Sequence, residues 1–124
     1  MLTPVSFMEK GLCEVYVGVY KLSGQCIPHS FGIEVDDTII PGENIEGIKI
    51  KKHTVNKLQS VFLFKHLKMV TYGDKLTLYT THHKFEGEFI GCDGDNEGHV
   101  RYIFLKNDGD EGFIIIPISK VVAL

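Results

Sequence analysis

Lysine is the chemically active residue type that this sequence concentrates most clearly, and its ammonium group binds phosphate and carboxylate groups. Residues 47–70 hold six lysines and no acidic residue, whereas residues 1–46 hold two lysines against seven acids and residues 71–124 hold five basic against nine acidic residues. Such a block predicts a surface for phosphate or for an acidic partner, or one that complements acidic groups of the protein itself. The candidate contacts are Lys49, Lys51, Lys52 and Lys57.

Aromatic and planar side chains would complete a nucleic-acid surface, because bases stack on rings and guanidinium groups. Tyr79 is a candidate stacking partner, and Arg101 is the single arginine of the chain. The scarcity of arginine and the net charge of −3 argue against nucleic-acid binding by one isolated subunit. An oligomeric ring that gathers its lysines on one face would remove that objection.

A cysteine and a histidine support a different hypothesis, that of a cysteine hydrolase using Cys92 and His29. The segment PHSFGIEVDDTII, residues 28–40, is similar to the His-bearing strand of permuted papain-like hydrolases of the lecithin retinol acyltransferase type. A reactive thiolate needs a nearby base or a helix N-terminus, and Asp93 beside Cys92 works against its formation. This hypothesis therefore ranks third, and the chain is expected not to be an enzyme.

Metal sites are poorly supported by the sequence. The loop Asp93–Gly98 has carboxylate and amide side chains at positions 1, 3 and 5 of a calcium-type loop, but Phe104 stands where a bidentate Glu is needed. His82 and His83 are adjacent and would point to opposite faces of a strand. We therefore expect no metal and no cofactor.

Composition predicts one compact protein of the soluble, intracellular, cytoplasmic kind. The 124 residues are 44% hydrophobic, without a long apolar run or a basic-then-apolar N-terminus. Cys13, Cys26 and Cys92 are odd in number and lack Cys-x-x-Cys spacing, so all three are expected to be free thiols. No membrane contact is expected.

Most of the chain has the alternation of β-strands. Strands are expected over residues 13–22, 29–40, 45–52, 75–82, 84–92, 99–107 and 112–124, the last interrupted at Pro117. Short polar connections after residue 82 predict an antiparallel series of hairpins. Residues 54–70 lack Gly and Pro and favour a helix. The expected organisation is an N-terminal β extension over 1–53 and a helix plus small barrel over 54–124, or one continuous domain.

The last 70 residues resemble the Sm-like small barrels of the Sm, LSm and Hfq proteins. The resemblance rests on the helix candidate, the strand LTLYT, the pattern Phe85-x-Gly87-x-Phe89-x-Gly91-x-Asp93 and the closing IIIPISKVV. It implies a helix followed by a strongly bent, closed antiparallel β-barrel in which the glycines permit curvature.

The same resemblance implies a function, an RNA-binding protein that assembles into rings through its strand edges. The base-contacting asparagine of the family would fall on Glu97, with Asn96 one place early, and the Arg-Gly pair of the second motif is replaced by IIIPIS. The sequence therefore predicts a non-catalytic oligomeric binding module, first for RNA. The alternative is a protein-interaction or inhibitory module of the viral or mobile-element type, with no nucleic-acid ligand.

Overall fold

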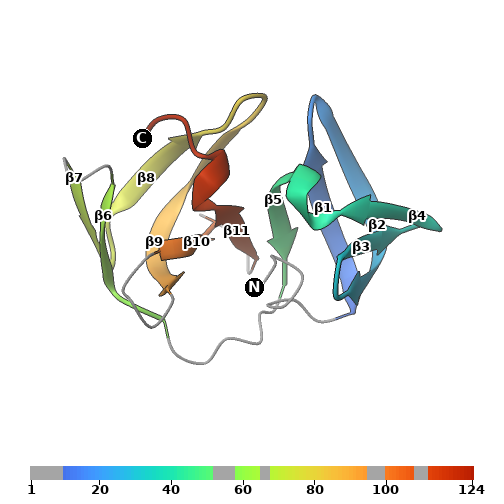
Figure 1. Cartoon of the computed structure of the whole chain (residues 1–124). Coiled ribbons are helices and arrows are strands. Elements are labelled where there is room, and N and C mark those ends of the chain that lie inside the picture. Colours follow the sequence, from blue (N-terminus) through green and yellow to red (C-terminus); the bar gives the residue numbers. More distant parts are fainter. Residues whose placement is uncertain (1–9, 52–57, 65–67, 95–99, 108–111) are drawn as a thin grey trace.

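One long antiparallel sheet and one separate hairpin make up the computed structural model, which describes residues 10–51, 58–64, 68–94, 100–107 and 112–124 (Figure 1). Nine strands form the sheet in the order β4-β3-β2-β1-β5-β11-β10-β9-β8, and β6 pairs with β7 alone. The strands are β1 (Gly11–Val17), β2 (Tyr20–His29), β3 (Gly32–Val35), β4 (Thr38–Pro41), β5 (Ile45–Ile50), β6 (Val61–Phe64), β7 (Lys68–Thr71), β8 (Lys75–Tyr79), β9 (Lys84–Gly94), β10 (Val100–Lys106) and β11 (Phe113–Pro117). The prediction of a mainly β protein is confirmed.

Tight turns connect the N-terminal strands. Asp36 and Asp37 both have positive φ, 46° and 70°, and form the two-residue turn between β3 and β4. Aspartate tolerates this left-handed conformation better than most residues. The single strand expected over residues 13–22 is instead a hairpin, because Gly18, with φ 54°, and Val19 reverse the chain between β1 and β2.

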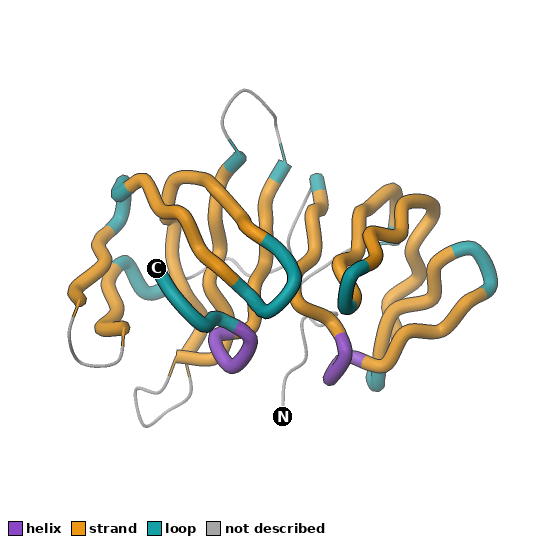
Figure 2. The backbone as a smooth tube through the Cα atoms, turned by 90° about the horizontal axis from the view of Figure 1, so that it is seen from above, coloured by secondary structure: helices purple, strands orange, loops and turns teal. Residues whose placement is uncertain are grey.

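Two hydrophobic cores lie on opposite faces of the sheet. The N-terminal core contains Cys13, Val15, Cys26, Ile33, Val35, Ile40, Ile45, Ile48, Ile50, Tyr102, Phe104 and Ile115. The C-terminal core contains Phe62, Val70, Leu76, Leu78, Phe85, Phe89, Cys92, Ile103, Leu105, Ile114, Ile116 and Val121. Alternate residues of β10 and β11 enter one core or the other, so these central strands are buried on both faces. Figure 2 shows the strands curling away on either side of this shared centre.

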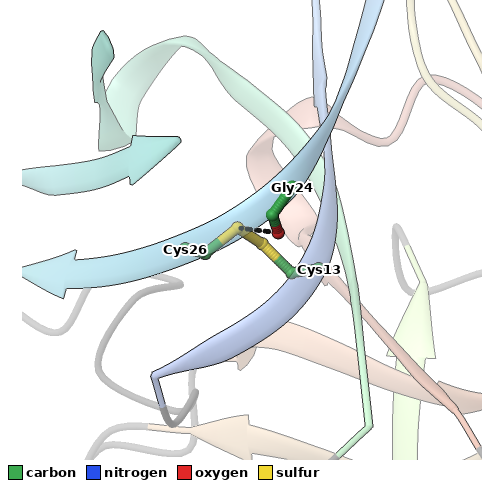
Figure 3. Close-up of a disulfide and its surroundings, with 3 residues drawn as sticks. All are labelled: Cys13, Gly24 and Cys26. Carbon is green, nitrogen blue, oxygen red and sulfur yellow. Dashed lines mark hydrogen bonds between the residues drawn. A yellow bond between two sulfur atoms is a disulfide. The ribbon is translucent and has the colours of Figure 1, made fainter. Parts of the chain in front are cut away.

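The prediction of three free thiols is wrong, because Cys13 and Cys26 form a disulfide with a Cα–Cα distance of 6.1 Å (Figure 3). Cys13 lies opposite Gly24 in the β1–β2 ladder, so Cys26 is its diagonal neighbour on the same face. The pairing depends on strand register, which the spacing of cysteines along the chain does not show. Cys92 is free and buried.

The predicted helix over 54–70 is also wrong in the part of this segment that the structure describes, which forms β6 and β7. Phe62 and Val70 are paired across the hairpin and are buried, whereas Leu63 and Met69 are paired and exposed. This period of two satisfies the C-terminal core better than a helical stripe would, despite the helix propensity of Leu, Met and Lys. Helical structure among the described residues is confined to short 3-10 turns at Gly42–Asn44 and Ile118–Lys120. The described residues contain no helix that is long and apolar enough to cross a membrane.

The predicted closed barrel is not formed. Closing the strands β5-β11-β10-β9-β8 would require β8 to pair with β5. Because β5 pairs with β11 on one side and with β1 on the other, it has no edge left for β8. At Tyr79 the outer edge of β8 instead bonds to Val122 and Ala123, near the end of the chain. The result is an open roll.

Glycines in β9 allow this strand to bend through the roll. A Cβ on Gly87 would stand 2.7 Å from the carbonyl oxygen of Lys106, closer than side chains approach. Gly91 has φ 151° and lies at a register shift between β9 and β10. Both positions therefore require glycine, as the sequence pattern predicted.

Candidate ligand-binding groove

Two of the predicted lysines, Lys49 of β5 and Lys51 just after its end, lie close together and line the same cleft. Ile48 and Ile50 point into the N-terminal core, so Lys49 and Lys51 point to the opposite face. Successive residues on one face of a strand are roughly 7 Å apart. The sheet thus holds two ammonium groups in a fixed row beside β1 and β11.

A groove runs past these lysines and consists of two adjoining clefts of about 330 and 540 Å³ that share Lys49 and Asn107. The smaller cleft is also lined by Tyr16, Lys84, Phe85, Glu86 and Ile114. The larger cleft is also lined by Leu12, Cys13, Glu14, Ser23, Gly24, Ile50, Lys51, Gly112 and Phe113. We call this surface the lysine groove. Its lining combines ammonium groups with rings and aliphatic side chains, a mixture that suits a ligand with both anionic and apolar parts.

The charges in the lysine groove are not all available to a ligand. Lys84 is paired with Glu86 at 3.0 Å, and both side chains are exposed. Within the described ranges of the chain, neither Lys49 nor Lys51 forms a hydrogen bond or ion pair through its ammonium group. Glu14 lies directly across the ladder from Lys49 and accepts a hydrogen bond of 3.1 Å from the hydroxyl of Tyr16. The free positive charge of the groove therefore comes from Lys49 and Lys51.

Aromatic packing fixes the wall of the smaller cleft. The ring of Tyr16 packs edge-on against Phe85 and His83, with centroid distances of 4.8 and 4.9 Å. Burial, together with the charge of Glu14, raises the pKa of Tyr16 to about 12. The phenol is therefore neutral at physiological pH and serves as a hydrogen-bond donor. The edge-to-face contacts with Phe85 and His83 hold the ring of Tyr16 in place.

A buried carboxylate connects the two walls of the smaller cleft. The ladder between β1 and β5 shifts register at this point, because Tyr16 pairs with Gly47 and Val17 with Ile45. The bulge leaves Glu46 unpaired and lets its side chain point toward the turn after β8. Glu46 accepts hydrogen bonds from the hydroxyl of Thr80 at 2.5 Å, from the backbone N–H of His82 at 3.1 Å and from Nδ1 of His82 at 2.6 Å. We call these three residues the carboxylate latch.

The electrostatics of the carboxylate latch favour its charged form. Burial alone would raise the pKa of Glu46, whose side chain is 7% exposed. The hydrogen bonds from Thr80 and His82 outweigh burial and hold the pKa of Glu46 below its ordinary value. The latch joins β5 to the β8–β9 turn, the two parts of the roll that share no ladder. It therefore sets the spacing between the cleft walls that carry Lys49 and Lys84.

The other predicted ligand-binding residues do not join this groove. Tyr79, 42% exposed, lies at the end of β8, where its backbone bonds to residues 122 and 123. Arg101 lies at a bulge in β10, and its buried Nε has no hydrogen-bond partner among the residues that the structure describes. Neither residue lines either cleft. Lys52, Lys57 and Asn96 lie outside the described residues.

The geometry gives no support to the hydrolase hypothesis. Burial, with the neighbouring charge of Asp93, raises the pKa of Cys92 to about 11, so its thiol is protonated at neutral pH. His29 lies on β2 and bonds to Glu34 at 3.2 Å, with β1, β5, β11 and β10 between β2 and β9. The expected nucleophile and base are therefore not adjacent in the sheet.

Metal ligands do not converge in the part of the chain that the structure describes, where no group of three His, Cys, Asp or Glu side chains could hold an ion. His82 turns toward Glu46, whereas His83 packs on Tyr16. Most of the Asp93–Gly98 loop lies outside the described residues, so the calcium hypothesis is not tested there.

Comparison with known proteins does not assign this chain to a family. No family model, curated protein or solved structure matches the chain. The resemblance to Sm-like barrels thus stays a prediction.

Several groove residues carry no signal in the sequence. Lys84 and Asn107 come from β9 and from the end of β10, and only strand pairing brings them beside Lys49. Glu46 follows Ile45 as an ordinary polar residue of an alternating segment, and its role depends on the bulge opposite Tyr16. The lysine density of residues 47–70 was the one local signal that pointed to this surface.

Proposed function

We propose that this protein is a non-catalytic binding module that holds single-stranded RNA in the lysine groove. The observation that carries the proposal is the pair of ammonium groups of Lys49 and Lys51, which form no ion pair with the described residues and lie in a lining of mixed polar and apolar side chains. Single-stranded nucleic acids bind to surfaces that combine positive charge for the backbone with rings and apolar groups for the bases.

The groove provides these two kinds of contact on adjacent strands. Lys49 and Lys51 would neutralise phosphates, while Leu12 and Tyr16 offer apolar surface in the same lining. The paired Lys84 and Glu86 would contribute polarity rather than net charge. With few cations and two carboxylates in the lining, binding is expected to be weak in one subunit and strongly salt-dependent.

The first test replaces both lysines by glutamate and measures binding to a fluorescent oligoribonucleotide at several salt concentrations. Loss of detectable binding is expected for the pair Lys49→Glu and Lys51→Glu. The pair Lys49→Gln and Lys51→Gln should lower the slope of log affinity against log salt by about 1.4, since each phosphate contact on a single strand contributes about 0.7. The matched control is the same change of charge at Lys68 and Lys120, which lie outside the groove.

Two results would overturn this proposal. One is unchanged RNA affinity in the groove variants, and the other is an equal loss in the Lys68 and Lys120 control. Unchanged binding would leave the alternative, a protein-interaction or inhibitory module. A ring assembly is a separate prediction, and the mass in solution from sedimentation would test it directly.

A further inference from the structure

The outer edge of β4, to which no other strand of the described residues pairs, carries a second inference, independent of the lysine groove. Figure 1 shows β4 at the outer margin of the N-terminal half, at the end of the meander β2-β3-β4. An edge strand presents unpaired backbone groups that can pair with another extended chain.

The hydrogen-bond pattern identifies which backbone groups of β4 point outward. The N–H of Gly42 donates to the carbonyl of Phe31 at 2.9 Å, so Gly42 points toward β3. Antiparallel ladders alternate, and the register pairs Ile33 with Ile40 and Glu34 with Ile39. Ile40 therefore bonds to β3, while the N–H and C=O of Ile39 point away from the sheet. Pro41 also points outward but contributes only its carbonyl.

The side chains beside this edge are unusually apolar for an exposed surface. Ile27, Glu34 and Ile39 form a row across β2, β3 and β4 on the outer face. Ile27 and Ile39 are 36% and 49% exposed, and Phe31, stacked on His29, is 58% exposed. A strand added at β4 would place one of its side chains beside Ile39, so that it extends this row.

The charge around the edge is uniformly negative. Residues 32–44 contain Glu34, Asp36, Asp37 and Glu43 and no lysine or arginine. Asp37 is exposed at the start of β4, and Glu43 is exposed just beyond its end. An incoming strand would meet a carboxylate at each end and apolar groups between them.

This charge pattern decides between a second copy and a different partner. Two copies paired antiparallel with Ile39 opposite Ile39 would place Asp37 of each copy opposite Pro41 and two positions from Glu43 of the other. Each end of such a pair would carry only carboxylates, and like charges repel. A basic strand would find opposite charges at both ends. We propose that β4 binds an extended, lysine- or arginine-containing segment of a partner protein by strand addition.

The test uses a short capped peptide with lysine at both ends and alternating threonine and valine between them. Titration is followed by the amide signals of the isotope-labelled full chain in nuclear magnetic resonance and by amide hydrogen exchange. The N–H of Ile39 should shift, and its exchange should slow by about tenfold or more at saturation, because it acquires a backbone acceptor. The same peptide with glutamate in place of lysine is the control ligand.

Two sets of variants test the backbone and the charges separately. Ile39→Pro removes the outward N–H without removing a bond of the β3–β4 ladder, and proline is tolerated at such edges. It should abolish peptide binding, whereas Ile39→Val should retain it. Asp37→Asn with Glu43→Gln should weaken binding roughly threefold to tenfold at low salt and less at high salt, since exposed ion pairs are weak and are screened by salt. These variants also keep the test valid if Ile39→Pro fails to fold.

Other outcomes would overturn the inference. Equal binding of the glutamate peptide, shifts confined to residues away from β4, or wild-type affinity in a folded Ile39→Pro protein would each do so. Dimerisation abolished by Ile39→Pro would show that the occupant is a second copy. The Lys49 and Lys51 variants should bind the peptide normally, so failure here and failure of RNA binding are separable.

Discussion

A different kind of cross-link stabilises each of the two halves of this protein. In the N-terminal core a disulfide joins β1 to β2, two strands that already share a ladder and are 13 residues apart at the cysteines. In the C-terminal core the carboxylate of Glu46 joins β5 to the turn after β8, 34 to 36 residues further along and without a shared ladder. The disulfide reinforces a hairpin whose strands are already hydrogen-bonded to each other. The hydrogen bonds of Glu46 instead connect two segments that no ladder joins.

The cores are nevertheless not independent, because they share strands. Tyr102 and Phe104 of β10 lie in the N-terminal core, while Ile103 and Leu105 lie in the C-terminal core. Loss of either core would expose one face of the same strand. We therefore expect both halves to unfold together.

The largest effect is expected from removing one buried ring from each core. Phe89 and Phe104 are both fully buried, in the C-terminal and the N-terminal core respectively. Replacing either by alanine removes apolar contacts and leaves a cavity, so each should lower the free energy of unfolding by about 3–5 kcal/mol. Thermal and denaturant unfolding should still show one transition in both variants.

A replacement at the exposed Tyr72, which should change stability by less than about 0.5 kcal/mol, is the control for these rings. Two separate transitions in the Phe104→Ala protein would show that the N-terminal meander unfolds by itself. In that case the shared strands do not couple the cores.

The next largest effect concerns the covalent link alone. Replacing Cys13 and Cys26 together by alanine should lower the free energy of unfolding by about 3 kcal/mol, as expected for a loop of this length. The double replacement avoids leaving a buried free thiol, and Cys92→Ala provides a matched change at the unpaired cysteine. Chemical denaturation measures the loss, and mass after alkylation without reductant verifies the bond. Identical stability with and without a reducing agent would contradict a structural role for this disulfide.

How much of this architecture the sequence predicts depends on the range of the interaction. The hairpins from β8 to β11 follow from local alternation and short polar turns, and Lys49 and Lys51 follow from alternation in one strand. The helix prediction was wrong over the described residues 58–64 and 68–70 because propensity is local, whereas the burial of Phe62 and Val70 depends on the C-terminal core. The disulfide and the open roll both depend on register and strand order.

Glu46 shows the same limit in a single side chain. Its position follows from the bulge opposite Tyr16 and from the approach of the β8–β9 turn, neither of which is encoded near residue 46. The β4 edge was also predicted only in part, because the single strand expected over residues 29–40 is divided by the Asp36-Asp37 turn into β3 and β4. What the sequence does not show is that β4 ends the sheet, with no strand among the described residues paired to its outer edge.

The smallest effect, and the sharpest test of the comparison, is expected from Glu46→Gln. Glutamine keeps the size of the side chain but lacks the charged carboxylate whose oxygens accept hydrogen bonds from Thr80 and His82. The free energy of unfolding should therefore fall by about 2 kcal/mol at neutral pH. Because the pKa of Glu46 is lowered in the folded state, its stabilising contribution is complete above the ordinary value of 4.5 and is lost as the pH falls through the folded value. Stability measured from neutral to acid pH should therefore fall more steeply in the wild-type protein than in the variant.

Glu86→Gln is the matched control, since Glu86 forms only an exposed pair with Lys84 and should contribute less than about 1 kcal/mol. The disulfide does not titrate, so the Cys13 and Cys26 double variant should keep the wild-type pH profile at lower stability. Parallel pH profiles for the wild-type and Glu46→Gln proteins would mean that the latch is not charged in the folded state. Because the latch joins the parts of the fold that carry Lys49 and Lys84, Glu46→Gln should also weaken RNA binding, although both lysines remain in place. Glu86→Gln changes the net charge by the same amount and therefore separates this effect from one of net charge.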